Sequence, residues 1–291
     1  MTDIRDRAVQ LYDAYTHEHR DRRRLLREIA AMAGSVAAAE VLIAGIGASP
    51  AAAAVIAPDD KRLRIVRDVN QFAGKPLKSY TAWPREQGAV RGFVLVVHEN
   101  RGLNAHIEDV ARRTALAGFV AIAPDFISAQ GGTPPDPDKA REMIGAADYD
   151  LLLAQAGGML DFVAGMHGVR VRTGAVGFCW GGAFVNRLAV AAGPKLAAGV
   201  AYYGPAPAPS EAAKVQAALM LHYAGKDARV ATTGEPWAAA LKAAGKRVEA
   251  FTYPGVDHAF NNDTSAERYD KAAAELAWGR TIAFLKRELD A

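Results

Sequence analysis

A single cysteine stands in a glycine-rich stretch whose pattern predicts a nucleophile. Residues 177–182 read Gly-Phe-Cys-Trp-Gly-Gly, and Cys179 is the only cysteine among the 291 residues. A nucleophile between two glycines is typical of a sharp turn from a strand into a helix, although serine is commoner there than cysteine. The amides at the start of that helix favour a thiolate and can bind an oxyanion. The alternative is an inert thiol, since free cysteines are often buried.

An acid and a histidine follow the cysteine in the order that a catalytic triad requires. Asp227 comes 48 residues after Cys179, and His258 comes 31 residues later. Each follows a predicted strand, and the carboxyl ends of parallel strands meet at one edge of a sheet. The order nucleophile, acid, histidine is that of α/β hydrolases. Asp257 is an alternative acid, but its position next to His258 favours a turn residue.

Other polar residues could belong to the same site. Glu99 follows a buried apolar run and should lie at the same edge of the sheet. His98 and His106 flank the Glu99 loop and could line a pocket, whereas His222 is expected to be packed within a strand. Trp180 is expected to pack beneath the turn, with its backbone amide as the functional part.

The elements that must position these residues alternate between strands and helices. Two alternating segments predict an antiparallel hairpin, and the continuous apolar runs predict buried parallel strands. The pattern predicts an α/β fold, with a mainly parallel sheet covered by helices on both faces, over residues 58–291. The strands are expected at 62–70, 77–83, 91–98, 119–125, 173–178, 196–203, 217–224 and 247–253. The helices are expected at 104–117, 139–147, 150–166, 183–192, 235–244 and 266–289, with loops at 131–138 and 205–209.

Composition and charge exclude several classes of protein. The chain has 35 basic and 32 acidic residues, a net charge of +3, and no sustained basic run beyond its N-terminal segment, so no nucleic-acid partner is expected. One cysteine excludes a disulfide within the chain and any multi-cysteine metal site. We expect neither a cofactor nor a catalytic metal.

The first 57 residues differ in composition from the rest. Residues 1–30 are charged and predicted to be helical, with Arg22-Arg23-Arg24 near their end, and residues 29–57 are rich in Ala and Gly and carry only Glu40 as a charge. The arginines, the weakly apolar stretch and the small residues at Ala51–Ala54 predict a twin-arginine signal for export to the periplasm. The alternative is a helical element docked on the domain of a cytoplasmic protein. No stable membrane span is expected.

Four motifs together resemble the dienelactone hydrolase family, whose members are carboxymethylenebutenolidase-like, and in particular its branch with a twin-arginine-like leader. The motifs are the cysteine turn, the strand ending in His98-Glu99, Pro124-Asp125-Phe126 and His258-Ala259-Phe260. The resemblance extends from about residue 58 to the C-terminus. It implies an α/β-hydrolase fold and cofactor-free hydrolysis of a small enol-lactone or ester through a Cys-His-Asp triad.

The resemblance also implies a role for each site residue. Cys179 would be the nucleophile, His258 the base and acid, and Asp227 the residue that orients the histidine. Glu99 matches the family glutamate that interacts with the resting thiol and helps to activate it when substrate arrives. The backbone amides of Trp180 and Asn100 would bind the oxyanion.

The substrate-binding positions depart from the family pattern. Well-known members bind a substrate carboxylate with arginines, one of them four residues after the catalytic histidine, where this chain has Asn262. Arg141 and Arg101 are further candidates for that contact. The alternative functions are therefore a general carboxylesterase or thioesterase, or a non-catalytic binding protein on the same fold. The sequence does not define an oligomeric state.

Overall fold

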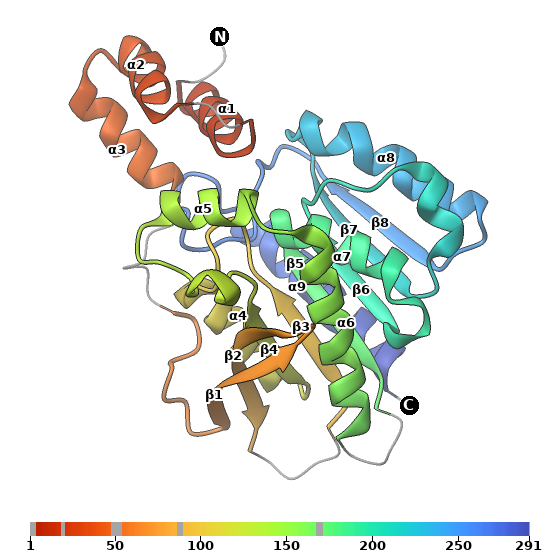
Figure 1. Cartoon of the computed structure of the whole chain (residues 1–291). Helices are drawn as coiled ribbons and strands as arrows, with labels where there is room; N and C mark the ends of the chain where they lie inside the picture. The colour runs from red at the N-terminus through yellow and green to blue at the C-terminus, as the bar shows by residue number, and fades with distance from the viewer. Residues whose placement is uncertain (1–3, 19–20, 48–53, 86–89, 167–170, 291) are drawn as a thin grey trace.

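The computed structural model describes residues 4–18, 21–47, 54–85, 90–166 and 171–290. Its centre is an eight-stranded sheet with the strand order β1-β2-β4-β3-β5-β6-β7-β8 (Figure 1). The strands are β1 (Leu63–Phe72), β2 (Lys75–Pro84), β3 (Phe93–Val97), β4 (Val120–Asp125), β5 (Thr173–Phe178), β6 (Ala198–Tyr202), β7 (Ala218–Ala224) and β8 (Val248–Tyr253). The expected α/β-hydrolase architecture is confirmed.

The first two strands form the expected antiparallel hairpin, and β2 then pairs antiparallel with β4. The remaining neighbours pair in parallel, with Val96 opposite Val176 and Val176 opposite Val200. Strands β3 to β7 are buried throughout, which explains their continuous apolar sequences. Parallel pairing brings the carboxyl ends of β5, β7 and β8 to one edge of the sheet.

Two hydrophobic clusters hold helices against the two faces of the sheet. One cluster includes side chains of α4 (Ala105–Leu116) and α9 (Lys271–Leu289), and the other includes side chains of α6 (Tyr149–Gly165), α7 (Trp180–Ala191) and α8 (Ala228–Ala243). The short helix α5 (Pro137–Gly145) precedes α6. The core therefore has the three layers that the alternating sequence predicts.

Three helix boundaries differ from the sequence prediction. Helix α7 begins at Trp180, immediately after the cysteine, and α8 begins at Ala228 because the Asp227 carboxylate accepts a hydrogen bond from the Val230 amide and so caps the helix. Helix α9 begins only at Lys271, because Asp270 caps it and the preceding residues form turns. The differences at α8 and α9 follow from capping residues that periodicity alone does not locate, whereas α7 starts directly at the turn after Cys179.

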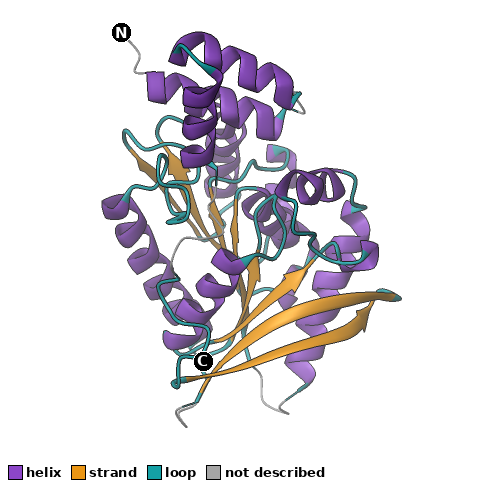
Figure 2. Ribbon diagram, turned by 90° about the vertical axis from the view of Figure 1, so that its left-hand side faces the viewer, coloured by secondary structure: helices purple, strands orange, loops and turns teal. Residues whose placement is uncertain are grey.

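The N-terminal segment forms three helices outside the layers of the sheet: α1 (Ile4–His17), α2 (Arg22–Ala33) and α3 (Val36–Ile46). Figures 1 and 2 show them packed together at one end of the molecule. They share a small core of their own, which includes Val9, Tyr12, Leu25 and Ile29. We call α1–α3 the cap.

The cap lies within the N-terminal segment for which the sequence predicts an export signal. Among the described residues, no single helix is long and apolar enough to cross a membrane. Helices α2 and α3 together have the length and composition of a membrane span, but they are bent by 112° relative to each other. Of the small residues expected at the end of a signal, Ala51–Ala54, residues 51–53 lie outside the described residues. The twin-arginine signal stays a prediction.

Candidate active site

Cys179 occupies a strained turn between β5 and α7. Its backbone has φ 54° and ψ −112°, a conformation that residues with a side chain rarely adopt, and its amide donates to the Tyr202 carbonyl at 3.0 Å. The flanking positions must be glycine because other backbone atoms lie too close to leave room for a Cβ atom. A Cβ on Gly177 would lie 2.1 Å from the Gly181 carbonyl oxygen, and one on Gly181 would lie 2.4 Å from the Val97 carbonyl oxygen. The turn thus has the geometry expected of a nucleophile elbow.

His258 and Asp227 form a buried pair beside this turn. The Nδ1 atom of His258 lies 2.5 Å from Oδ2 of Asp227, and the Nε2 atom of His258 is buried without a hydrogen-bond partner. Burial lowers the pKa of His258, but the charge of Asp227, the proximity of Cys179 and hydrogen bonds outweigh it and raise the pKa to about 10. Burial also raises the pKa of Asp227, but the charge and hydrogen bond of His258 outweigh this and lower it. The pair is therefore ionic near neutral pH.

Asp257, the alternative acid, pairs with an arginine of the cap. Its Oδ2 atom lies 2.9 Å from Nη1 of Arg5 in the cap. The geometry therefore places Asp227, rather than Asp257, in contact with His258.

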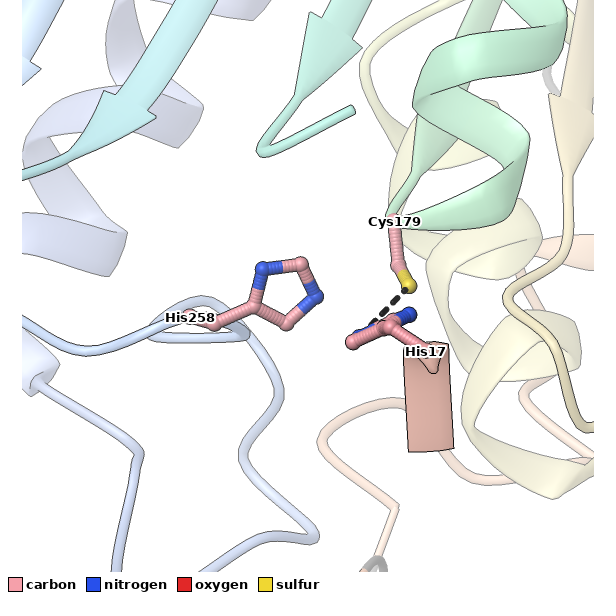
Figure 3. Close-up of side chains that lie close together, drawn as sticks. All are labelled: His17, Cys179 and His258. Atoms are coloured by element: carbon pink, nitrogen blue, oxygen red, sulfur yellow. Dashed lines mark hydrogen bonds between the residues drawn. The ribbon is translucent and has the colours of Figure 1, made fainter. Parts of the chain in front are cut away.

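A third side chain, from the cap, completes the group around the sulfur. Nε2 of His17, the last residue of α1, lies 3.9 Å from Sγ of Cys179, and the His17 and His258 rings meet edge to face at 4.8 Å between centroids. Figure 3 shows both histidines next to the cysteine. Burial, together with repulsion from His258 and nearby arginines, lowers the pKa of His17 well below its ordinary value. His17 is therefore neutral.

Glu99 lies at the same edge, just beyond the end of β3. Its Oε2 atom accepts a hydrogen bond from Nδ2 of Asn262 at 2.7 Å, and its Oε1 atom is buried without a hydrogen-bond partner. Asn262, expected as a substrate contact, is thus bonded to the glutamate. Its side-chain oxygen also accepts from Thr264.

A small cavity of about 30 Å³ lies between the cap and the sheet edge. It is lined by Tyr12, Thr16, His17, Glu99, Asn100, Arg101, Cys179, His258, Ala259 and Arg268. Its volume suits about one water molecule, whereas ligand pockets usually enclose several hundred Å³. Helix α1 of the cap forms one side of the cavity.

Two arginines line the cavity, and α1 supplies a partner to each. Arg101 donates to the Tyr12 hydroxyl at 3.1 Å and pairs with Asp138 at 2.8 Å. Arg268, which is only 8% exposed, pairs with Asp13 at 3.2 Å. The helix therefore contacts the two cationic groups that border the cavity.

Arg141, a candidate substrate contact, instead holds the cap. It donates to the Tyr15 carbonyl oxygen at 2.8 Å, and its guanidinium lies over the Tyr15 ring. The proposed oxyanion donors remain candidates by position: Trp180 begins α7 directly after the cysteine, and Asn100 lines the cavity.

The other three histidines among the described residues are held by structural contacts. His222 bonds to the Tyr253 and Thr281 hydroxyls within β7, as its predicted packing requires. His98 bonds to the Glu99 carbonyl and stacks on Trp180, while His106 pairs with Asp263. These contacts occupy ring nitrogens of all three histidines.

Sequence reasoning missed two residues of the site. His17 and Cys179 are 162 positions apart, and no motif surrounds His17. Arg268 lies in the turn region before α9, where the sequence predicted a helix. The sequence showed only that an arginine follows the His258 motif ten positions later, and this alone did not predict that Arg268 borders the site.

Comparisons with known proteins identify relatives of the chain. The model of the dienelactone hydrolase family matches residues 77–289. A relative from Escherichia coli (strain K12), named "Putative carboxymethylenebutenolidase", is 30% identical over 256 residues, which cover 82% of this chain and 93% of that protein. The cap precedes the range that the family model matches.

Solved structures show the same similarity. A Klebsiella pneumoniae structure, named "Putative Dienelactone Hydrolase", is 30% identical with a TM-score of 0.68, covering 76% of this chain and 98% of that one. A dienelactone hydrolase from Anabaena variabilis, at 18% identity and a TM-score of 0.63, covers 78% of this chain and 99% of that one and shares the fold.

Proposed function

Since the chain belongs to the dienelactone hydrolase family, a family of carboxylic ester hydrolases, we propose that it hydrolyses a small enol-lactone or ester through Cys179, His258 and Asp227. The observation that carries this proposal is the His258 side chain. Asp227 holds its Nδ1 atom, its Nε2 atom is buried without a hydrogen-bond partner, and a ring nitrogen of His258 lies within 4.8 Å of the Cys179 sulfur. A nucleophile, a base and an orienting acid in this arrangement suit covalent catalysis.

The reaction uses each group in turn. The Cys179 thiolate attacks the acyl carbonyl, and the amides of Trp180 and Asn100 hold the oxyanion. His258, whose raised pKa favours the imidazolium, protonates the departing oxygen. Neutral His258 then removes a proton from water, which attacks the thioester and releases the acid. An enol leaving group suits a thiolate, since a stable enolate needs little protonation.

Glu99 has a separate part in the proposal. Its free Oε1 atom borders the same cavity as the sulfur. A carboxylate beside a thiol favours the neutral thiol in the resting enzyme, because two close anions repel each other. When substrate binds, Glu99 accepts the Cys179 proton and so yields the thiolate, and it returns the proton after the acyl group has left the sulfur. Asn262 holds the other oxygen of Glu99 and thereby fixes the carboxylate in the cavity.

The arginines favour a substrate with a carboxylate. Arg101 and Arg268 border the cavity, and their partners Tyr12 and Asp13 both belong to α1. A displaced cap would withdraw Asp13 and leave the Arg268 guanidinium for an anion, whereas Arg101 would keep its pair with Asp138. This supports an acidic enol-lactone or ester over a neutral one.

A panel of substrates tests the proposal on the full chain. Enol-lactones, p-nitrophenyl esters and thioesters are compared by kcat/KM, with and without a carboxylate on the acyl part. We expect the highest values for acidic enol-lactones or activated esters. No turnover of any substrate, together with no alkylation of Cys179 by iodoacetamide at neutral pH, would contradict an enzymatic role and favour a binding protein.

A further inference from the structure

Three metal-binding atoms converge where the cap meets the catalytic domain. The ligand atoms of His17, Cys179 and His258 all lie within 4.8 Å of one another, and His17 Nε2 is 3.9 Å from the sulfur. The residues come from the end of α1, the strained turn before α7 and the loop after β8, as Figure 3 shows. Only folding brings these three donors together, since they are far apart in the sequence.

We propose that these three side chains form a binding site for a zinc-class divalent cation. One sulfur and two imidazole nitrogens are ligands that Zn²⁺ prefers, and three protein ligands leave a fourth position open. Bond lengths of about 2.3 Å to sulfur and about 2.0 Å to nitrogen place tetrahedral S and N ligands roughly 3.6 Å apart. The His17–Cys179 separation is 3.9 Å, so a small side-chain movement closes the site on a metal.

The surroundings of His258 supply a second, independent observation. Its Nε2 atom is buried and has no hydrogen-bond partner, so it becomes a ligand by losing its proton and without breaking a contact. Asp227 holds the opposite ring nitrogen at 2.5 Å. A carboxylate behind a metal-bound imidazole fixes the tautomer and ring orientation that coordination needs.

The cavity provides the open coordination position. Its volume of about 30 Å³ lies beside the three ligands and has room for a water molecule. Glu99 borders the cavity with its unpartnered Oε1 atom, which can accept a hydrogen bond from that water. The nearby cations Arg101 and Arg268 oppose a metal, but each is paired with a carboxylate, Asp138 and Asp13 respectively.

Coordination at this site would block hydrolysis and hold the cap closed. The metal binds the Cys179 sulfur and His258 Nε2, the two atoms that the proposed reaction requires, and His17 links α1 to both. Zn²⁺ binds a thiolate and a neutral imidazole, so the proton of the Cys179 thiol and the proton on Nε2 of His258 both leave to solvent when the metal binds, and no oxidation or reduction occurs. The inhibition rests on the proposed function, whereas the binding does not.

Metal binding is measured directly on the full chain after removal of metal with a chelator. Zn²⁺ is titrated in competition with a chromophoric chelator, and Co²⁺ is added separately to record its absorption spectrum. We expect one ion per chain, a thiolate-to-cobalt charge-transfer band, and hydrolysis that Zn²⁺ abolishes and EDTA restores. Mg²⁺, which prefers oxygen ligands, should not inhibit.

Variants separate this site from adventitious metal binding. His17→Ala should weaken Zn²⁺ binding and raise the half-inhibiting Zn²⁺ concentration by roughly 100-fold or more, because loss of even an outer-shell partner costs about 10–100-fold. His106→Ala, which removes a histidine paired with Asp263, should keep wild-type affinity. Cys179→Ala should lose the charge-transfer band, while circular dichroism checks that each variant is folded.

The outcomes distinguish the inference from the proposed function. Equal Zn²⁺ affinity in wild type and His17→Ala, or a Co²⁺ spectrum without the thiolate band, would overturn the site. Tight binding that depends on His17 in a chain with no hydrolytic activity would support the site and contradict the proposed function. Hydrolysis that Zn²⁺ does not affect would overturn the site and leave the proposed function standing.

Discussion

The Asp227 carboxylate meets the His258 ring at 2.5 Å, although the two residues are 31 positions apart. Asp257, the immediate neighbour of His258, binds Arg5 instead. Asp227→Asn should lower kcat/KM by roughly four decades, because an amide favours the wrong imidazole tautomer. Asp257→Asn should have a far smaller effect. Steady-state kinetics on both variants decide the assignment, and a reversed order would make Asp257 the acid.

The same pair predicts how stability depends on pH. The pKa of His258 is raised from its ordinary 6.5 to about 10, so its contribution to folding is full below pH 6.5 and is lost as the pH rises through about 10. The lowered pKa of Asp227 makes its own contribution present above its ordinary 3.8. The advantage of wild type over Asp227→Asn in free energy of unfolding should therefore be largest near pH 6 and shrink toward pH 10.

Urea unfolding at a series of pH values measures that difference. Asparagine is also a good N-cap, so the substitution preserves the start of α8 and isolates the effect of charge. Asp257→Asn is the matched control, since its carboxylate contacts Arg5 and its effect should not follow the titration of His258. A constant difference for Asp227→Asn across the range would contradict the ionic pair.

Cys179→Ala should lower hydrolysis by roughly three decades or more while the protein stays folded. The change removes one thiol from the core and should cost on the order of 1 kcal/mol in free energy of unfolding. Product formation and thermal unfolding are measured on the same preparation. Turnover close to wild type would exclude Cys179 as the nucleophile. Cys179→Ser should retain little activity, since a hydroxyl needs stronger activation by a base.

Glu99→Gln should slow hydrolysis by roughly one to several decades, the scale for a positioned proton acceptor. Alkylation of Cys179 by iodoacetamide at neutral pH should become faster, because a negative charge has left the cavity. Asn262→Ala should show the same two effects more weakly, since Glu99 keeps its charge but loses its 2.7 Å hydrogen bond. A Glu99→Gln protein unchanged in both measurements would remove Glu99 from the mechanism.

Arg268→Gln should raise KM for carboxylate-bearing esters by about 10–100-fold, because losing a hydrogen bond between charged groups weakens binding by about that factor. Matched neutral esters serve as the internal control and should be unaffected. Arg141→Gln is the control variant, because Arg141 contacts Tyr15 and not the cavity. Equal changes for acidic and neutral esters would show that Arg268 does not select charge.

The strands and helices of residues 58–291 were predictable because buried positions recur with the period of each type of element. The alternation in 62–70 and 77–83 gave the antiparallel hairpin, and the apolar run before Glu99 gave a buried strand. Helix α8 was predicted to start too late because its first turns, at 228–233, lack an apolar stripe, while the Asp227 cap that starts it is a single residue.

The site was less predictable where contacts depend on tertiary structure. Cys179, Asp227 and His258 each follow a strand, so their order and strand context were informative. Asn262 and Arg141 have polar side chains suited to a substrate, but packing directs them to Glu99 and Tyr15. His17 had no local signal, because only the docking of α1 brings it to the sulfur.

The contacts of α1 have a consequence for the order in which the protein folds. Arg5 pairs with a residue 252 positions later, and Arg268 reaches Asp13 across 255 positions. During synthesis α1 leaves the ribosome long before its partners beyond β8 are made. Such long-range contacts form late, because closing long loops costs entropy before it yields contacts. The cap should therefore dock after the sheet is complete, and its amides should exchange hydrogen before those of β5 and β7.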